Sequence, residues 1–150
     1  PPPPPPFRMS QSLPICPPNN SIPNIYPLAL ARSVSRPPGL EILSFRQNLL
    51  TDASAISESK SASGLTQLVF HDNQLQQIPS LGAFRNLMRL ELSYNEIRSL
   101  KPLTELAEAP LTEMFAAANK ITSLEGIEAL TKLEVLEVGS NRLKVRLRLA

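Results

Sequence analysis

Composition and charge exclude several classes of protein before any motif is considered. The 150 residues include 15 Lys or Arg and 13 Asp or Glu, but from Gly39 to Asn141 eight basic residues face thirteen acidic ones, a charge of −5. The basic excess therefore lies at the two ends, which excludes a broad nucleic-acid-binding face on the body of the chain. The single cysteine, Cys16, argues against a disulfide-stapled secreted domain and predicts a reducing compartment. No run of about 18 apolar residues occurs, so no membrane span is predicted.

The first segment, residues 1–38, is rich in proline and contains no acidic residue. It holds thirteen of the sixteen prolines, six of them in an unbroken run that favours polyproline II. Its apolar residues follow neither helical nor strand periodicity, so we predict a disordered tail. Three further interpretations stay open: a ligand for a proline-recognition domain, an organellar transit peptide, or a wrongly placed start of the gene model.

Residues 39–145 carry an internal repeat that follows L-x-x-L-x-L-x-x-N-x-L with apolar substitutions. Examples are LTQLVFHDNQL, LMRLELSYNEI and LEVLEVGSNRL. The asparagines that anchor the repeat recur at nearly regular intervals, with a period typical of stacked repeat architectures. These structural asparagines are Asn48, Asn73, Asn95, Asn119 and Asn141.

Each repeat predicts a short strand, a sharp turn and an irregular return. In the third repeat Leu90 and Leu92 point inward, while Arg89 and Glu91 lie on the opposite face of the pleat. The asparagine follows at the turn, where its amide can satisfy backbone groups, so stacked repeats would line the asparagines into a ladder. The return path carries an apolar residue at every third position, which predicts 3-10 turns. After Asn119 these positions are Ile121, Leu124, Ile127 and Leu130.

These features predict an α/β leucine-rich-repeat solenoid of about 4.5 repeats of 22–25 residues. Short parallel strands would line the concave face, and 3-10 or short helical turns the convex face. Residues 146–150 break the pattern and are expected to form an irregular end. Neither end carries a recognisable cap, so we expect an apolar flank at each end, marginal stability and self-association. We also expect the sequence to be truncated at both ends.

The pattern contains no constellation of catalytic or metal-binding residues. The only histidine, His71, falls on the open strand face beside Asp72, without a nucleophile or second base, and is interpreted as a surface residue. The five glycines form no phosphate-binding loop, and no Cys/His cluster has metal-ligand spacing. We therefore predict a protein that is not an enzyme, with no catalytic site, no metal and no cofactor.

The repeats also resemble a known family. FRQNLL, HDNQLQQIP, LSYNEI and above all LEVLEVGSNRL are similar to the leucine-rich-repeat regulatory subunit of protein phosphatase 1 (regulatory subunit 7, the sds-twenty-two type). The resemblance extends over residues 40–145, which is most of the chain. It implies a non-catalytic scaffold whose partner is the phosphatase catalytic subunit, and we expect it in the nucleus and the cytoplasm.

The same resemblance implies where the partner binds. In the family, contacts come largely from the residue between the two strand leucines of successive repeats, in an acidic and aromatic series. Adjacent strands lie about 4.8 Å apart, so an acid, an aromatic and an acid would form a row about 10 Å long that brackets a basic side chain. By register the series is Val69, Glu91, Phe115 and Glu137. Further candidates on this face are Tyr94, Arg89 and Glu113.

Two alternatives remain open. The general repeat is shared by many proteins, so the chain would also suit an adaptor for another intracellular complex, such as a ribonucleoprotein or a cytoskeletal assembly. The chain departs from the family in having fewer than half of its repeats and Ala116 in place of a core leucine. A non-functional fragment is therefore the other alternative.

Overall fold

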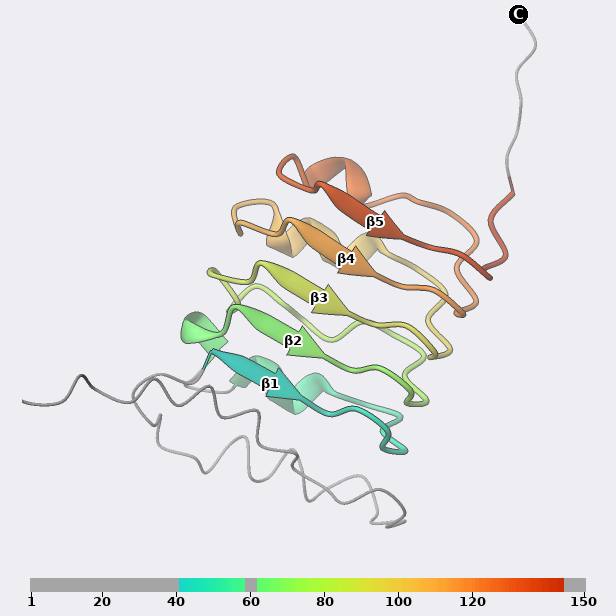
Figure 1. The fold of residues 1–150 in the computed structure, drawn as a ribbon, viewed down its shortest axis with the longest axis horizontal. Helices are drawn as coiled ribbons and strands as arrows, with labels where there is room; N and C mark the ends of the chain where they lie inside the picture. Colours follow the sequence, from blue (N-terminus) through green and yellow to red (C-terminus); the bar gives the residue numbers. More distant parts are fainter. Residues whose placement is uncertain (1–40, 59–61, 145–150) are drawn as a thin grey trace, which may run out of the picture.

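Five short strands form a single parallel sheet in the part of the chain that the computed structural model describes, residues 41–58 and 62–144. The strand order follows the sequence, so each coil of the chain adds one strand beside the previous one (Figure 1). The predicted tail at 1–38 and the irregular end at 146–150 lie outside the described residues. The strands are β1 (Ile42–Ser44), β2 (Gln67–Val69), β3 (Arg89–Glu91), β4 (Glu113–Phe115) and β5 (Val135–Glu137).

Three of the four returns between strands contain short 3-10 helices, most of which lie behind the sheet in Figure 1, and the return from β2 to β3 contains none. A coil as short as this repeat leaves no room for a long α-helix, and an apolar residue at every third position suits a three-residue turn. The leucine-rich-repeat solenoid predicted from the sequence is confirmed. The helices are η1 (Ser54–Glu58), η2 (Ala62–Gly64), η3 (Lys101–Leu106) and η4 (Ile127–Ala129).

The core lies between the sheet and the return path. The middle residue of every strand is apolar, and parallel register stacks these residues on one another. Full burial of one such leucine is worth about 1.5–3 kcal/mol, and a single coil could not supply it because half of its apolar surface would face water. Stacking of coils is therefore what stabilises the fold. The stacked residues are Leu43, Leu68, Leu90, Met114 and Leu136.

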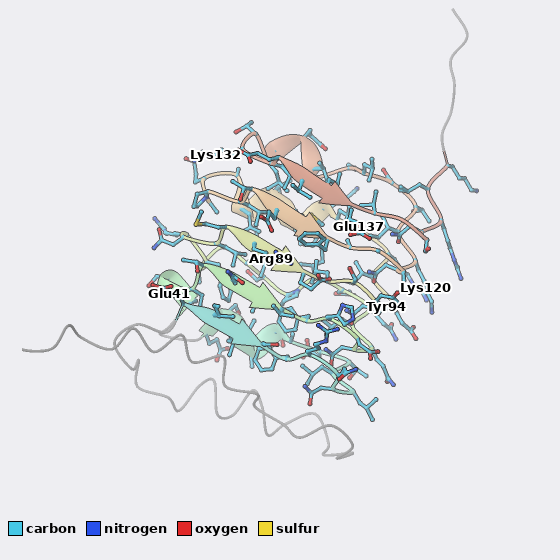
Figure 2. The ribbon with its side chains drawn as sticks, in the orientation of Figure 1. Glu41, Arg89, Tyr94, Lys120, Lys132 and Glu137 are labelled. Carbon is cyan, nitrogen blue, oxygen red and sulfur yellow. The ribbon has the colours of Figure 1, made fainter. Side chains whose placement is uncertain are left out.

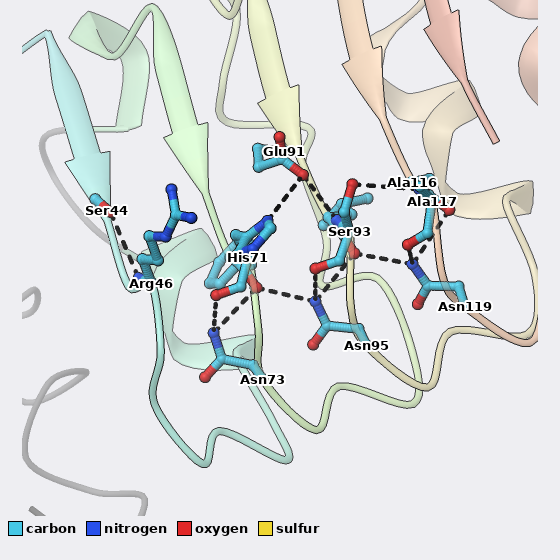
Figure 3. Close-up of polar contacts among 12 residues, drawn as sticks. Ser44, Arg46, His71, Asn73, Glu91, Ser93, Asn95, Ala116, Ala117 and Asn119 are labelled. Atoms are coloured by element: carbon cyan, nitrogen blue, oxygen red, sulfur yellow. Dashed lines mark hydrogen bonds and ion pairs between the residues drawn. The ribbon is translucent and has the colours of Figure 1, made fainter. Parts of the chain in front are cut away.

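The asparagine after each of β2 to β5 joins its coil to the preceding one by hydrogen bonds, as Figure 3 shows for Asn73, Asn95 and Asn119. Nδ2 of Asn95 donates to the carbonyl of Leu92 in its own coil at 3.0 Å, and to that of Phe70 in the preceding coil at 2.9 Å. Its Oδ1 accepts the N–H of Leu75 in the preceding coil at 3.0 Å. Equivalent bonds to their own and to the preceding coil are made by Asn73, Asn119 and Asn141.

The residue before each asparagine has a left-handed backbone, with φ between 51° and 60°. This conformation reverses the chain sharply after the strand and brings the asparagine amide beneath it. Left-handed backbone costs an ordinary side chain about 1–2 kcal/mol, so the turn persists because the buried asparagine bonds require it. The sequence pattern had not indicated these positions, which are Gln47, Asp72, Tyr94, Ala118 and Ser140.

The two ends of the described solenoid differ. At the first coil, Leu43 and Phe45 are 7 % and 1 % exposed, so the expected apolar flank at this end was wrong. Both side chains belong to the continuous core. At the last coil the expectation holds: Leu136 is 36 % exposed, whereas its counterparts in the other strands are at most 7 % exposed. Leu124, one of the apolar positions predicted on the return path, is 41 % exposed because no further described coil packs against it.

Candidate protein-binding face

Alternation along the strands places the first and third side chains of each of β2 to β5 on the open face of the sheet, and the third side chains form a row across it. Register aligns Val69 with Glu91, Glu91 with Phe115, and Phe115 with Glu137. We call these four residues the strand row. The first three are partly buried and Glu137 is exposed. The series that the sequence predicted therefore lies side by side across four adjacent strands.

Glu91 is already engaged within the protein (Figure 3). Its Oε1 accepts the N–H of Ser93 at 2.9 Å and lies 3.6 Å from Nδ1 of His71, and its side chain is only 16 % exposed. The His71 ring also packs against Tyr94, with ring centroids 5.0 Å apart. The Ser93 hydroxyl accepts the N–H of Ala117 at 3.2 Å. Glu91 thus organises a network that extends into the coils on both sides.

The Phe115 ring makes a cation–π contact with Arg89 of the same chain. The guanidinium carbon of Arg89 lies 4.6 Å from the ring centroid, and Arg89 Nη1 donates to Glu113 Oε2 at 2.8 Å. Arg89 and Glu113 are directly opposite each other in β3 and β4, so Arg89 reaches Phe115 diagonally. An exposed cation–π contact of this kind contributes about 0.5–1 kcal/mol. Arg89 therefore approaches the ring from the β3 side.

Glu137, labelled in Figure 2, is the register partner of Phe115 on β5, on the opposite side of β4 from Arg89. Within the described chain its carboxylate has no hydrogen-bond or ion-pair partner. The surface next to Glu137 carries only small side chains. At the position two residues after each row residue, the side chain becomes smaller from the first coil to the last. From the first coil to the last, that position holds Arg46, His71, Ser93, Ala117 and Gly139.

The remaining predicted residues lie on the same face. Val69 forms the β2 end of the row, and Tyr94, which is 58 % exposed, occupies the left-handed turn after β3. The contacts of His71 were missed, because the sequence suggested an ordinary surface residue. Its side chain is only 21 % exposed. The sequence did contain a signal for this contact. His71 lies two positions after Val69, and a residue at that position is the diagonal neighbour of the row residue in the next coil, here Glu91.

The face offers a carboxylate, an aromatic ring and hydrogen-bonding groups, which suit recognition of another molecule. Across residues 41–58 and 62–144, no three His, Cys, Asp or Glu side chains gather closely enough to hold a metal ion. Nor does any helix in this described part have the length and apolar character needed to cross a membrane. The absence of a catalytic site and of a cofactor stays a prediction.

Comparison with curated proteins identifies a relative of the kind that the repeats resemble. Over 108 residues the chain is 38 % identical to a protein of Arabidopsis thaliana named protein phosphatase 1 regulatory inhibitor subunit PPP1R7 homolog. The match covers 71 % of this chain and 33 % of that protein, so the chain spans about a third of its relative's length. The resemblance inferred from the repeat motifs is confirmed. No protein-family model matches the chain.

Comparison with solved structures gives the same architecture. An internalin of Listeria monocytogenes (inlF) matches with a TM-score of 0.61 and 30 % identity, over 70 % of this chain and 29 % of that one. Internalin C2 of the same organism matches with a TM-score of 0.63 and 25 % identity, over 71 % and 45 %. A leucine-rich-repeat protein of Leptospira interrogans matches with a TM-score of 0.61 and 28 % identity, over 70 % and 26 %.

Proposed function

We propose, on the premise that this chain belongs to the leucine-rich-repeat proteins, that it is a non-catalytic subunit which binds the catalytic subunit of protein phosphatase 1. The relative at 38 % identity is named as a regulatory inhibitor subunit of that phosphatase. Because the chain spans only 33 % of that relative, its partner is carried over as a proposal. The observation that supports it is the alignment of the strand row in the parallel sheet.

The chemistry of the strand row suits a protein partner. Phe115 is partly buried and has an acidic residue on the neighbouring strand at either side. Aromatic anchors near the middle of an interface, surrounded by groups that exclude water, carry most of the binding energy in typical complexes. Val69 and Tyr94 extend the same surface by one apolar and one aromatic side chain. We therefore assign partner binding to this face.

The test is capture of the phosphatase catalytic subunit by the immobilised chain. Phe115→Ala should abolish capture while leaving the circular dichroism spectrum unchanged. Leu49→Ala is the matched control, because Leu49 is 58 % exposed and lies beyond the row, after the first strand and its turn. Equal capture by wild type and Phe115→Ala would remove the row as the binding site. Mass spectrometry of proteins captured from a lysate separates a phosphatase subunit from an adaptor of a ribonucleoprotein or cytoskeletal complex.

The proposed role carries a proposed location, the nucleus and the cytoplasm. Both are reducing compartments, in which a chain with a single cysteine needs no disulfide partner. Imaging of a fluorescent fusion in living cells tests the location. Signal confined to an organelle or to the secretory pathway would contradict it.

A further inference from the structure

We infer that a second surface of the chain, away from the strand row, binds a short acidic peptide segment of a partner. Figure 2 shows one residue of this surface, Lys120, on the side of the molecule toward which the strands point. The surface carries four basic side chains and one acidic one, although residues 39–141 as a whole have a charge of −5. Binding there is independent of the phosphatase partner proposed for the strand row. We call the four basic residues the basic rim: Arg98, Lys120, Arg142 and Lys144.

Stacking brings the rim residues together on three consecutive coils. In each of these coils an apolar side chain packs against the core two residues after the ladder asparagine, and the residues on either side of it point outward. The N–H of Lys120 donates to the carbonyl of Ile97 at 2.9 Å, and that of Arg142 to the carbonyl of Ile121 at 2.9 Å. The outward residues therefore form two adjacent columns, with about 5 Å between successive coils. The first column is Glu96, Lys120 and Arg142, and the second is Arg98, Thr122 and Lys144.

Glu96 shows which ligand chemistry the basic rim accepts. Its Oε2 accepts a hydrogen bond from Nζ of Lys120 in the next coil at 2.8 Å. That bond, and more weakly the charge of Arg98, lowers the pKa of Glu96 from its ordinary value. The rim cations thus stabilise a carboxylate in this molecule, through a charge-assisted bond that is stronger than a neutral one.

The next coil continues the cations without a carboxylate. Arg142 follows Lys120 in the first column, and Lys144 lies beside it in the second. Both side chains are exposed, and neither has a hydrogen-bond or ion-pair partner within residues 41–58 and 62–144. Thr122, also exposed, adds a hydroxyl to the second column. An Asp or Glu of a partner would fit beside Lys120 and Arg142, and a second acid beside Lys144.

The extent of the basic rim favours a short peptide over a nucleic acid. The cations cover three coils, a length of about 10 Å. Toward β1 the first column continues with Gln74 and Leu49, which carry no charge, and the open face of the sheet carries Glu91 and Glu137. A strand of phosphates would run from the rim onto uncharged or acidic surface, whereas two or three acidic side chains match the cations.

The test titrates hexa-glutamate into the full isotope-labelled chain and follows amide chemical shifts. We expect the largest shifts at Lys120, Arg142 and Lys144. The double variant Arg142→Gln/Lys144→Gln should bind the probe about tenfold more weakly and with a flatter salt dependence. Arg85→Gln/Lys132→Gln is the matched control. It removes two exposed cations from the side where the strands begin and should bind the probe as wild type does.

A second pair of variants tests the role of Glu96. Glu96→Gln releases Lys120, so we expect hexa-glutamate to bind this variant about threefold more tightly than wild type. Glu113→Gln is its matched control, because Oε2 of Glu113 lies 2.8 Å from Nη1 of Arg89 in a similar pair between coils, at the opposite ends of the strands. It changes the net charge equally and should leave the affinity for the probe unchanged.

The opposite results would overturn the inference. Equal affinity of wild type and Arg142→Gln/Lys144→Gln, or an equal loss in Arg85→Gln/Lys132→Gln, would show that the basic rim is not a binding site of its own. Binding of a thymidine hexanucleotide that equals or exceeds that of hexa-glutamate would assign the rim to nucleic acid instead. Weaker binding of the probe by Glu96→Gln would contradict a competition between Glu96 and the partner's acid for Lys120.

Discussion

The side-chain amide of Asn95 donates to the carbonyl oxygen of Phe70 at 2.9 Å, and so connects neighbouring coils through two residues that are 25 positions apart in sequence. The same amide bonds Leu92 and Ser93 in its own coil and accepts from Leu75 in the preceding one, while Asn95 is only 7 % exposed. Asn95→Ala would leave the buried Leu75 N–H unpaired and would remove one of the two hydrogen bonds that each of the Phe70, Leu92 and Ser93 carbonyls accepts. Since an unpaired buried donor costs about 1–3 kcal/mol and each lost hydrogen bond about 0.5–1.5 kcal/mol, we expect the free energy of unfolding in urea to fall by about 3 kcal/mol or more.

Asn48 provides the matched control for Asn95. It occupies the same place in the first repeat, but it is partly exposed and donates only to Phe45 and Arg46 of its own coil. Asn48→Ala should therefore cost about 1 kcal/mol. Equal losses for the two variants would contradict the view that bonds between coils make the asparagines important.

Gly126 should be intolerant of any side chain. Its φ is 106°, and a Cβ at this position would lie 2.5 Å from the Leu100 carbonyl oxygen in the preceding coil. Gly126→Ala forces η4 away from η3, and we expect a loss of at least about 2 kcal/mol in thermal or urea unfolding. Gly139→Ala is the control, because its Cβ would meet no atom within 4 Å and should change stability by less than about 0.5 kcal/mol. Similar losses for both would count against the close approach of these coils.

Glu105 should make stability depend on pH in acid. Its Oε2 accepts hydrogen bonds from the Ser80 hydroxyl at 2.8 Å and from the N–H groups of Leu81 and Gly82 at 2.7 and 3.0 Å. The Ser80 bond is the main cause that lowers the pKa of Glu105 from its ordinary 4.5. A carboxylate whose pKa is lower in the folded state stabilises the fold above the unfolded pKa, and this contribution is lost as pH falls through the folded pKa.

Glu105→Gln tests this linkage. At neutral pH the variant should be less stable by about 1 kcal/mol, a small value because the side chain is exposed. The difference from wild type should persist at pH 6 and shrink as the pH falls below about 4.5, the unfolded value. Urea unfolding at several pH values measures it. A difference that stays constant down to pH 3 would show that the charge of Glu105 is irrelevant.

The exposed last coil should lead to self-association. Val135 is 44 % exposed and Leu136 is 36 % exposed, and β5 is the open edge strand of the described sheet. Exposed edge strands with apolar side chains pair readily with other copies. We expect sedimentation velocity to show dimers or larger species that increase with concentration, and Leu136→Glu to reduce them. A wild-type chain that remains monomeric at high concentration would contradict this expectation.

The fold was predictable because a repeat pattern specifies one coil and then applies it again. The asparagines and the alternating leucines fix where each strand begins and which face it buries, so the row from Val69 to Glu137 follows from register alone. The contacts of Arg89 with Phe115 and of His71 with Glu91 do not follow from the pattern. They depend on side-chain conformations that are chosen among neighbours in other coils of the solenoid.

Other differences have equally local causes. Leu124 fits the pattern of Leu100, yet Leu100 is fully buried and Leu124 is 41 % exposed, because burial requires a following coil as well as an apolar side chain. The left-handed residues before each asparagine include Tyr94 and Ala118, which have no special tendency toward that conformation. There the tertiary hydrogen bonds override local preference.

The asparagine ladder has a direction. From Asn73 onward, each amide reaches back to the coil before it, and no asparagine in the described chain reaches back to the coil that contains Asn141. Every coil except the last is therefore fastened by its successor. Unfolding should start at β5 and proceed coil by coil toward β1. Amide hydrogens of the first coils should therefore exchange with solvent later than those near Leu136.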